Sequence, residues 1–198
     1  MVSTTYPTLI NLIWRKQNSV FRNFCLIIFG SFAMWASAKI QIPFYPVPLS
    51  MQTFVVLIIG MSMGWKLGSA TIIFYLAQGI VGLPVFAGTP EKGLGLVYIL
   101  GPTGGFLIGF VLAVAVVGWL AERGFNRTIP LAASAMIIGN IVIYIPGVLW
   151  LGSVIGWDKP VIELGILPFL LGDALKILIA TILLPKIWKF CRIKASSK

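Results

Sequence analysis

An acidic and a basic residue interrupt an otherwise apolar segment near the carboxyl end of the sequence. Asp173 and Lys176 lie within residues 166–180, where nearly all the other side chains are apolar. Because the two are three residues apart, a helix presents both on one face, one turn apart. A fixed carboxylate beside an ammonium group offers one acceptor and one cationic donor. This chemistry suits a small polar ligand with paired N–H donors or a carboxylate.

Two other interpretations of the pair remain open. Asp173 and Lys176 could neutralise each other as a purely structural pair, or they could serve an intramembrane enzyme as base and as acid or nucleophile. The sequence has no histidine, and no second acidic residue lies in an apolar segment. These absences favour binding over catalysis, and we expect no catalytic residues, no metal site and no cofactor.

The composition predicts an integral membrane protein. Of the 198 residues, 59% are hydrophobic and only 10% are charged, and the mean hydropathy is +1.00. An apolar run of about 20 residues is long enough to cross a bilayer as a helix. We therefore predict an all-α membrane protein with six transmembrane helices, at residues 21–38, 51–63, 69–81, 106–120, 131–151 and 164–188.

The basic residues predict the orientation of these helices. The net charge of +10 would suggest nucleic acid in a soluble protein, but here it indicates topology, and no nucleic-acid partner is expected. With both chain ends cytoplasmic, eleven Lys and Arg residues lie inside and three lie outside, at 39, 92 and 159. The predicted domains are an interfacial segment at 1–20, the six-helix ligand-binding domain at 21–190 and a basic cytoplasmic tail at 191–198.

Two long loops, after the first and third predicted helices, are unusually apolar. The first, residues 39–50, has three prolines, which rule out a continuous helix, and the second, residues 82–105, is rich in glycine. Long apolar loops in a compact domain are typically lids or binding loops. We expect both on the outer face, covering Asp173 and Lys176, with Phe44, Tyr45 and Phe86 forming part of a ligand wall.

Three further polar side chains are candidate ligand contacts. Asn140 lies in the fifth apolar run, and Tyr144 follows one helical turn later on the same face. Either could instead form a hydrogen bond between helices. Gln52 follows the proline-rich loop, where exposure alone could account for an amide, so it is the weakest of the three.

Four segments, in the same order along the chain, resemble the BioY biotin transporters. These substrate-capture subunits, or S components, belong to energy-coupling-factor uptake systems. The resemblance covers residues 25–190, and it is carried by residues 39–54, 82–88, 101–110 and 168–176.

The resemblance implies biotin uptake from the outer side of the cytoplasmic membrane. It places Asp173, Lys176 and Asn140 in the binding site, with Asp173 on the ureido N–H groups. Lys176 is expected to donate to either the ureido oxygen or the valerate carboxylate, and the sequence does not decide between them. Val85 and Gly88 enter the candidate site as part of the matching Gly82–Gly88 segment. A capture subunit for another small vitamin is the alternative within the same class.

The resemblance also implies partner subunits. Family members work with a transmembrane coupling subunit and two ATP-binding subunits. This sequence has no Gly-x-x-x-x-Gly-Lys-Ser/Thr loop, so a partner must hydrolyse the ATP. The family's docking pattern, Ala-x-x-x-Ala on the first helix, corresponds here to Ala33 and Ser37. Serine in the second place departs from that pattern.

Overall fold

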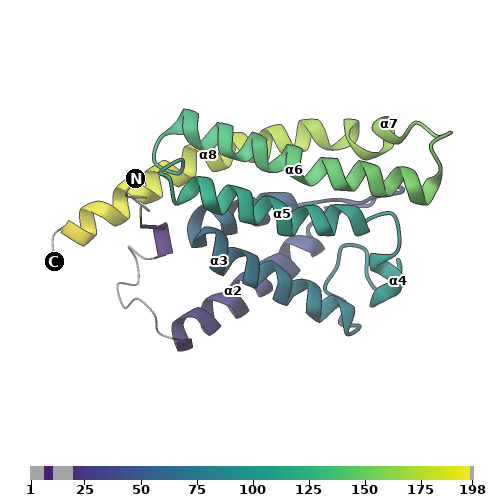
Figure 1. The fold of residues 1–198 in the computed structure, drawn as a ribbon, viewed down its shortest axis with the longest axis horizontal. Coiled ribbons are helices and arrows are strands. Elements are labelled where there is room, and N and C mark those ends of the chain that lie inside the picture. The colour runs from purple at the N-terminus through teal and green to yellow at the C-terminus, as the bar shows by residue number, and fades with distance from the viewer. Residues whose placement is uncertain (1–6, 11–19, 197–198) are drawn as a thin grey trace, which may run out of the picture.

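The computed structural model describes residues 7–10 and 20–196, with side chains up to Phe190. The chain is almost entirely helical in this part (Figure 1). Within the described residues, five segments are long and apolar enough to cross a membrane, and together they confirm the predicted all-α membrane protein. The elements are α2 (Val20–Lys39), β1 (Gln41–Ile42), β2 (Leu49–Ser50), α3 (Gln52–Ile80), α4 (Leu96–Ile99), α5 (Gly104–Ala121), α6 (Ile129–Ile155), α7 (Val161–Gly165) and α8 (Leu167–Ser196).

Helix α3 is folded back on itself at Gly64. This residue has φ +79° and ψ 178°, a non-helical conformation that glycine adopts without a steric penalty. The Gln52 amide donates to the Tyr75 hydroxyl at 2.8 Å, although 23 residues separate them. A straight helix would hold them roughly 34 Å apart, at 1.5 Å per residue. The two arms of α3 correspond to the predicted helices at 51–63 and 69–81.

The loops on either side of α3 meet at one end of the molecule. The first loop, residues 40–50, contains the antiparallel pair β1–β2, in which Gln41 pairs with Ser50. The second loop, residues 81–103, contains α4. Lys39 donates to the Thr89 carbonyl at 3.1 Å, and Lys92 donates to the Phe44 carbonyl at 3.2 Å. Lys39, the last residue of α2, thus ties the second loop to that helix, and Lys92 ties the two loops to each other.

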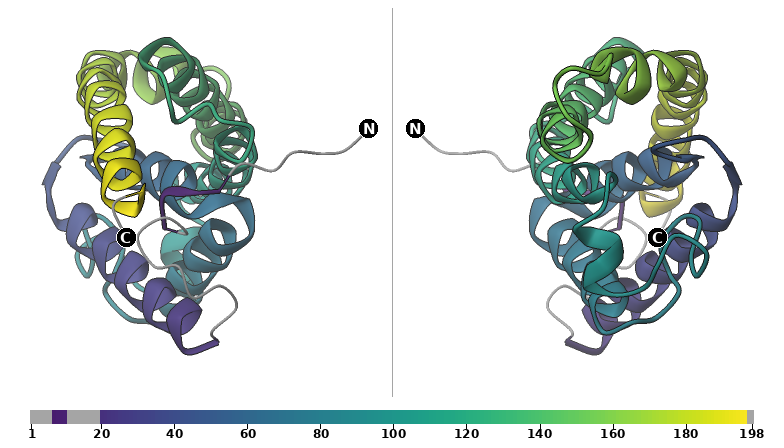
Figure 2. Two further views of the ribbon diagram at one scale, coloured as in Figure 1. Left: turned by 90° about the vertical axis from the view of Figure 1, so that its left-hand side faces the viewer. Right: turned by 90° about the vertical axis from the view of Figure 1, so that its right-hand side faces the viewer.

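The helices pack in chain order around two apolar clusters. Helix α3 contacts α2 and α5, α5 contacts α6, and α6 contacts α8. One cluster, which includes Tyr75, Phe86 and Phe106, lies under the loops. The other, which includes Met61, Met136 and Leu184, lies toward the carboxyl end of α8. Helices α4 and α7 lie at the opposite end of the molecule from that end of α8 (Figure 1), and end-on the dark-blue β1–β2 segment lies on the flank beside α8 (Figure 2).

Several finer sequence predictions differ from the structure or lie beyond it. The predicted sixth helix is divided by a break at Ile166 into short α7 and long α8. The interfacial segment falls mostly on residues 1–6 and 11–19, and the basic tail includes 197–198, all of which lie outside the described residues. The domain limits, the count of six membrane crossings and the cytoplasmic position of both ends stay predictions.

Close backbone contact at the α3 turn makes Gly118 a sensitive position. A Cβ atom added there would lie 2.4 Å from the Trp65 backbone nitrogen. Because backbone cannot move aside cheaply, Gly118→Ala should destabilise the fold by about 1–3 kcal/mol and lower the thermal unfolding midpoint in detergent. The matched control is Gly172→Ala in α8, where an added Cβ meets no atom within 4 Å. An unchanged midpoint for Gly118→Ala would contradict this packing.

Candidate binding site

Asp173, which is buried, and Lys176, which is partly buried, form an ion pair on α8 that has several further hydrogen bonds. The Lys176 ammonium lies 2.8 Å from Asp173 Oδ1. It also donates to the Ser50 carbonyl at 2.7 Å and to the Thr53 hydroxyl at 3.0 Å. Thr53 in turn donates to Asp173 Oδ1 at 2.9 Å. Asp173 is 3% exposed, so its charge is compensated by these donors rather than by water.

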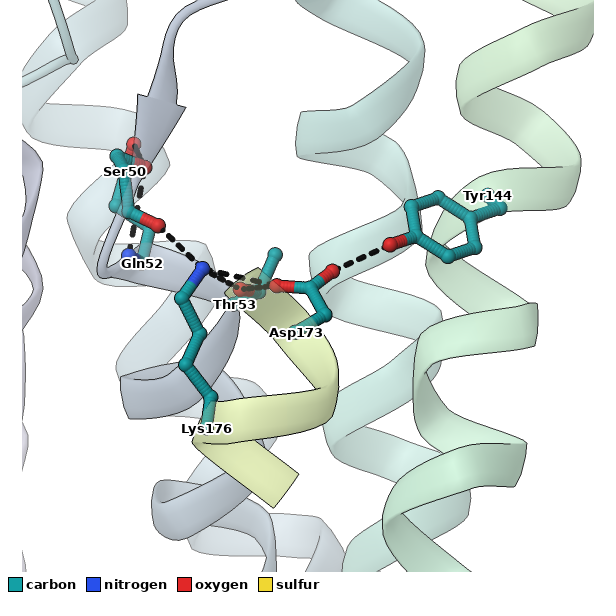
Figure 3. A network of polar contacts seen from close by, with 6 residues as sticks. All are labelled: Ser50, Gln52, Thr53, Tyr144, Asp173 and Lys176. Carbon is teal, nitrogen blue, oxygen red and sulfur yellow. Dashed lines mark hydrogen bonds and ion pairs between the residues drawn. The ribbon is translucent and has the colours of Figure 1, made fainter. Parts of the chain in front are cut away.

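Tyr144 approaches Asp173 from the other side. Its hydroxyl donates to Asp173 Oδ2, and Figure 3 shows the ring reaching the carboxylate from α6, away from Lys176. The carboxylate therefore receives donors from α3, α6 and its own helix. Each oxygen of a carboxylate can accept more than one hydrogen bond. Asp173 is therefore the acceptor that joins these three helices.

A chain of hydrogen bonds connects this pair with both loops. Ser50, whose carbonyl accepts from Lys176, donates its hydroxyl to Gln52 Oε1 at 3.1 Å. The Gln52 amide donates to the Tyr75 hydroxyl, which donates to the Val85 carbonyl at 2.8 Å in the second loop. Gln52 is only 3% exposed. Because Gln52 lies near the end of a predicted helix, exposure to solvent alone could account for a polar side chain there. The structure instead buries Gln52 within a polar network.

Asn140 lies one turn before Tyr144 on α6 and is 6% exposed. Its Oδ1 atom is buried and has no hydrogen-bond partner among the described residues. A buried amide oxygen without a partner costs free energy, so each such group needs an explanation. Asn140 thus has unused capacity to accept a hydrogen bond, although no hydrogen bond links it to Asp173.

A small cavity lies under the loops, and a larger groove lies beside it. The cavity has about 30 Å³ of free volume, and both loops, α3, α5, α6 and α8 contribute to its walls. The groove, about 370 Å³, runs between β1–β2 and α8 and is lined mostly by apolar residues, with Lys176 among them. Ser50 lines both spaces. The cavity walls are Val47, Pro48, Ser50, Gln52, Thr53, Ala87, Thr103, Phe106, Phe110, Ile143, Tyr144 and Phe169.

The predicted loop residues are distributed unevenly around this cavity. Phe86 is buried in the core, stacked on Tyr98 with 4.8 Å between ring centroids. Val85 contributes its carbonyl to the network described above, and Gly88 adopts φ +75° where the Lys92 side chain packs. Burial raises the pKa of the Tyr98 hydroxyl to about 12, so it remains protonated and donates to the Ala87 carbonyl at 2.7 Å.

The two aromatic residues of the first loop face outward. Tyr45 is 79% exposed and Phe44 is 36% exposed. Neither side chain lines the cavity. The residues of this loop that do line it are Val47, Pro48 and Ser50. In this closed arrangement the first loop therefore covers the site with aliphatic rather than aromatic side chains.

The predicted docking pair on α2 is not a surface feature. Ser37 is 4% exposed, and its hydroxyl donates to the Met34 carbonyl at 2.7 Å. Ala33 is half-buried. Ser37 thus packs against the protein's own interior in this structure, and its contact with a partner stays a prediction. The exposed side of α2 instead carries Phe21, Phe24, Phe29, Phe32 and Trp35.

Ser50 and Thr53 are the site residues that the sequence analysis missed. Both belong to the 39–54 segment that carries the family resemblance. Their position in that segment is the one feature of the sequence that could have indicated a role in the site. A short polar residue beside a helix start is ordinarily interpreted as a cap or a turn former. Their contact with Lys176 spans more than 120 residues of sequence.

These features define a helical membrane protein with a buried polar cluster as its candidate binding site. The model of the BioY family matches residues 12–193, and the chain belongs to this family. It is 39% identical over 146 residues to the probable biotin transporter BioY of Pyrococcus horikoshii, covering 74% of this chain and 83% of that protein. It is 36% identical over 146 residues, with the same coverage, to the biotin transporter BioY of Thermotoga maritima.

A solved structure has the same fold. The crystal structure of the S component for biotin from an ECF-type ABC transporter superimposes with a TM-score of 0.72. The match covers 88% of this chain and 94% of that one, at 22% sequence identity. This match shows that the helices of the two proteins share one three-dimensional arrangement.

The Thr53 hydroxyl is expected to be essential to the stability of the pair, because it accepts from Lys176 and donates to Asp173. Thr53→Val keeps the shape but leaves both charged groups short of a partner, so it should lower the free energy of unfolding by about 1–3 kcal/mol. Thr181→Val is the matched control. Thr181 is also buried, but its hydroxyl donates within α8, to the Leu178 carbonyl. Equal thermal shifts for the two variants would argue against the network.

Proposed function

We propose that this protein captures biotin at the outer face of the cytoplasmic membrane and releases it inward. The observation that carries the proposal is the carboxylate–ammonium pair at the end of the first loop, bonded to Thr53 and Tyr144 of the cavity wall, in a chain whose relatives are named biotin transporters. The protein is a multi-pass membrane transporter subunit and not an enzyme. Binding, rather than covalent chemistry, is what the site residues perform.

The polar groups match the fused ring of biotin. Asp173 is the acceptor for the two ureido N–H groups, which a carboxylate can bind side by side. In the closed structure, Thr53, Tyr144 and Lys176 already donate to Asp173. The ligand must therefore replace part of this network, and its N–H groups take over acceptor positions from the protein's own donors. Asn140 Oδ1 is a further acceptor one turn away from Tyr144.

Ligand entry requires the loops to move apart. Sites for drug-sized ligands have volumes of about 300–1,000 Å³, whereas the cavity under the loops has about 30 Å³. Separation of residues 40–50 from residues 81–103 would enlarge it. The loops then close over the bound ligand, and reorientation of the protein against its partner exposes the site to the cytoplasm, as alternating access requires.

Energy for this movement comes from partner subunits. We propose a transmembrane coupling subunit with ATP-binding subunits, in keeping with the absence of a phosphate-binding loop from this sequence. Because Ser37 is buried, the docking surface on α2 is assigned to its exposed aromatic side, including Phe29 and Phe32.

Biotin binding should depend on both members of the pair. Asp173→Asn and Lys176→Ala each remove a charge-assisted bond from a buried site, so each should weaken biotin binding at least tenfold. Equilibrium binding of labelled biotin to the purified protein measures this, with other vitamins as competitors. Asp158→Asn and Lys159→Ala are matched controls, because both residues are exposed in the connection between α6 and α7.

Undiminished binding in both the Asp173 and the Lys176 variant would overturn the site assignment. Stronger competition by another vitamin would identify that vitamin, rather than biotin, as the ligand. The biotin methyl ester identifies the group that Lys176 contacts. If Lys176 binds the carboxylate, Lys176→Ala should weaken biotin but leave ester binding unchanged. If Lys176 binds the ureido oxygen, both ligands should weaken equally.

Partner docking should depend on the aromatic side of α2. Phe29→Ala with Phe32→Ala removes two large exposed side chains and should reduce co-purification of the coupling subunit several-fold, with biotin binding retained. Ile145→Ala with Leu149→Ala on α6 is the control, since these residues are 56% and 58% exposed. Equal losses in both doubles would indicate a general effect of trimming the lipid-facing surface.

A further inference from the structure

A pocket with three cationic side chains lies at the end of the molecule away from the loops. It has a volume of about 420 Å³, and the described residues that line it are Arg127, Pro185, Lys186, Trp188 and Lys189. None of these residues is acidic. The pocket plays no part in the biotin site, because Lys186 is 13 residues beyond Asp173 on α8, roughly 20 Å along the helix.

One of the three cationic side chains, that of Arg127, is fixed in place. The Arg127 guanidinium stacks over the Trp188 ring, with 4.4 Å between its central carbon and the ring centroid. The Trp188 side chain is only 7% exposed, which fixes the ring. The adjacent Asn126 is fully buried and donates to the Met61 carbonyl at 3.1 Å, which anchors the connection between α5 and α6. Arg127 is thus held in position rather than being a flexible surface residue.

The pocket lies where the apolar part of α8 gives way to its basic part. Ile182, Leu183 and Ile187 on the same stretch are exposed hydrophobic residues, whereas Lys186 and Lys189 are exposed cations. Tryptophan is also typical of the level of the lipid headgroups. The acidic residue of the neighbouring connection, Glu122, accepts from the Trp65 backbone N–H at 3.2 Å, at the start of the second arm of α3.

We propose that this pocket binds the phosphodiester headgroup of an anionic phospholipid. A guanidinium and two ammonium groups match the geometry and charge of a phosphate. Basic pockets between membrane helices on the cytoplasmic side are typical headgroup sites, and the distribution of basic residues predicts that this end lies on that side. The exposed apolar residues of α8 beside the pocket provide a surface for the acyl chains, which favours a lipid over a soluble phosphate or an acidic protein segment.

The test counts lipids bound to the detergent-purified protein by native mass spectrometry, with phosphatidylglycerol and phosphatidylcholine titrated separately. The wild type should retain phosphatidylglycerol in preference to phosphatidylcholine. Lys186→Gln with Lys189→Gln should weaken this binding at least tenfold, and an unchanged thermal unfolding midpoint in detergent shows that the fold is retained. The control double, Lys66→Gln with Arg123→Gln, removes the same charge from cations that contact Trp65 and Trp119 instead, and should bind lipid like the wild type.

Three results would overturn the proposal. Equal losses in the two doubles would mean diffuse attraction to a basic surface. Equal retention of the two lipids by the wild type would mean that the headgroup charge is not recognised. Displacement of the lipid by inorganic phosphate at the same concentration would mean a site for free anions. None of these results depends on whether the ligand under the loops is biotin.

Discussion

The burial of an ion pair in an apolar helix is the constraint on which the arrangement of this protein depends. A charged residue at the centre of a membrane helix costs about 2.5–3.5 kcal/mol, and Asp173 and Lys176 cannot satisfy all of each other's hydrogen-bonding groups. The remaining partners come from Ser50, Thr53 and Tyr144. The end of the first loop, the start of α3 and the middle of α6 must therefore meet α8 at one place. A carboxylate with this many donors is also able to exchange them for those of a ligand.

The fold-back of α3 makes this convergence possible. Because the helix reverses at Gly64, Gln52 and Tyr75 lie beside each other, and a polar connection runs from the first loop to Val85 in the second. The absence of a side chain at Gly118 lets α5 lie directly against the turn. Small residues thus set the helix positions, whereas the long polar side chains determine what the space between the helices can bind. The two kinds of residue act on different parts of the same core.

The sequence predicted the parts of the site that depend on local periodicity. The spacing of Asp173 and Lys176 on one helix, and of Asn140 and Tyr144 on another, follows from 3.6 residues per turn. The fold-back of α3 follows from the short apolar runs on either side of Gly64. Ser50 and Thr53 were out of reach, because their roles depend on how the first loop meets a helix more than 120 residues away.

The side chains of Ser37 and Phe86 both point into the protein, which the sequence did not predict, and the two cases have a related cause. A small-xxx-small pattern shows that a helix can be approached closely, but it does not show by what, and at Ser37 the neighbour belongs to the same chain. Phe86 was expected in a ligand wall because it lies in a loop. Its ring stacks on Tyr98 from a later part of the same loop, and a contact of this kind is set by tertiary structure. In both cases the residue type was informative, whereas the direction of the side chain was not.

The lysine contacts at the loops have a consequence for how the site can open. Lys39, at the end of α2, holds the second loop through Phe86 and Thr89, and Lys92 of the second loop holds the first through Phe44. Separation of the loops breaks the Lys92 bond whichever loop moves, whereas movement of the second loop must also break the bonds with Lys39. By these contacts the second loop is restrained at two points and the first loop at one.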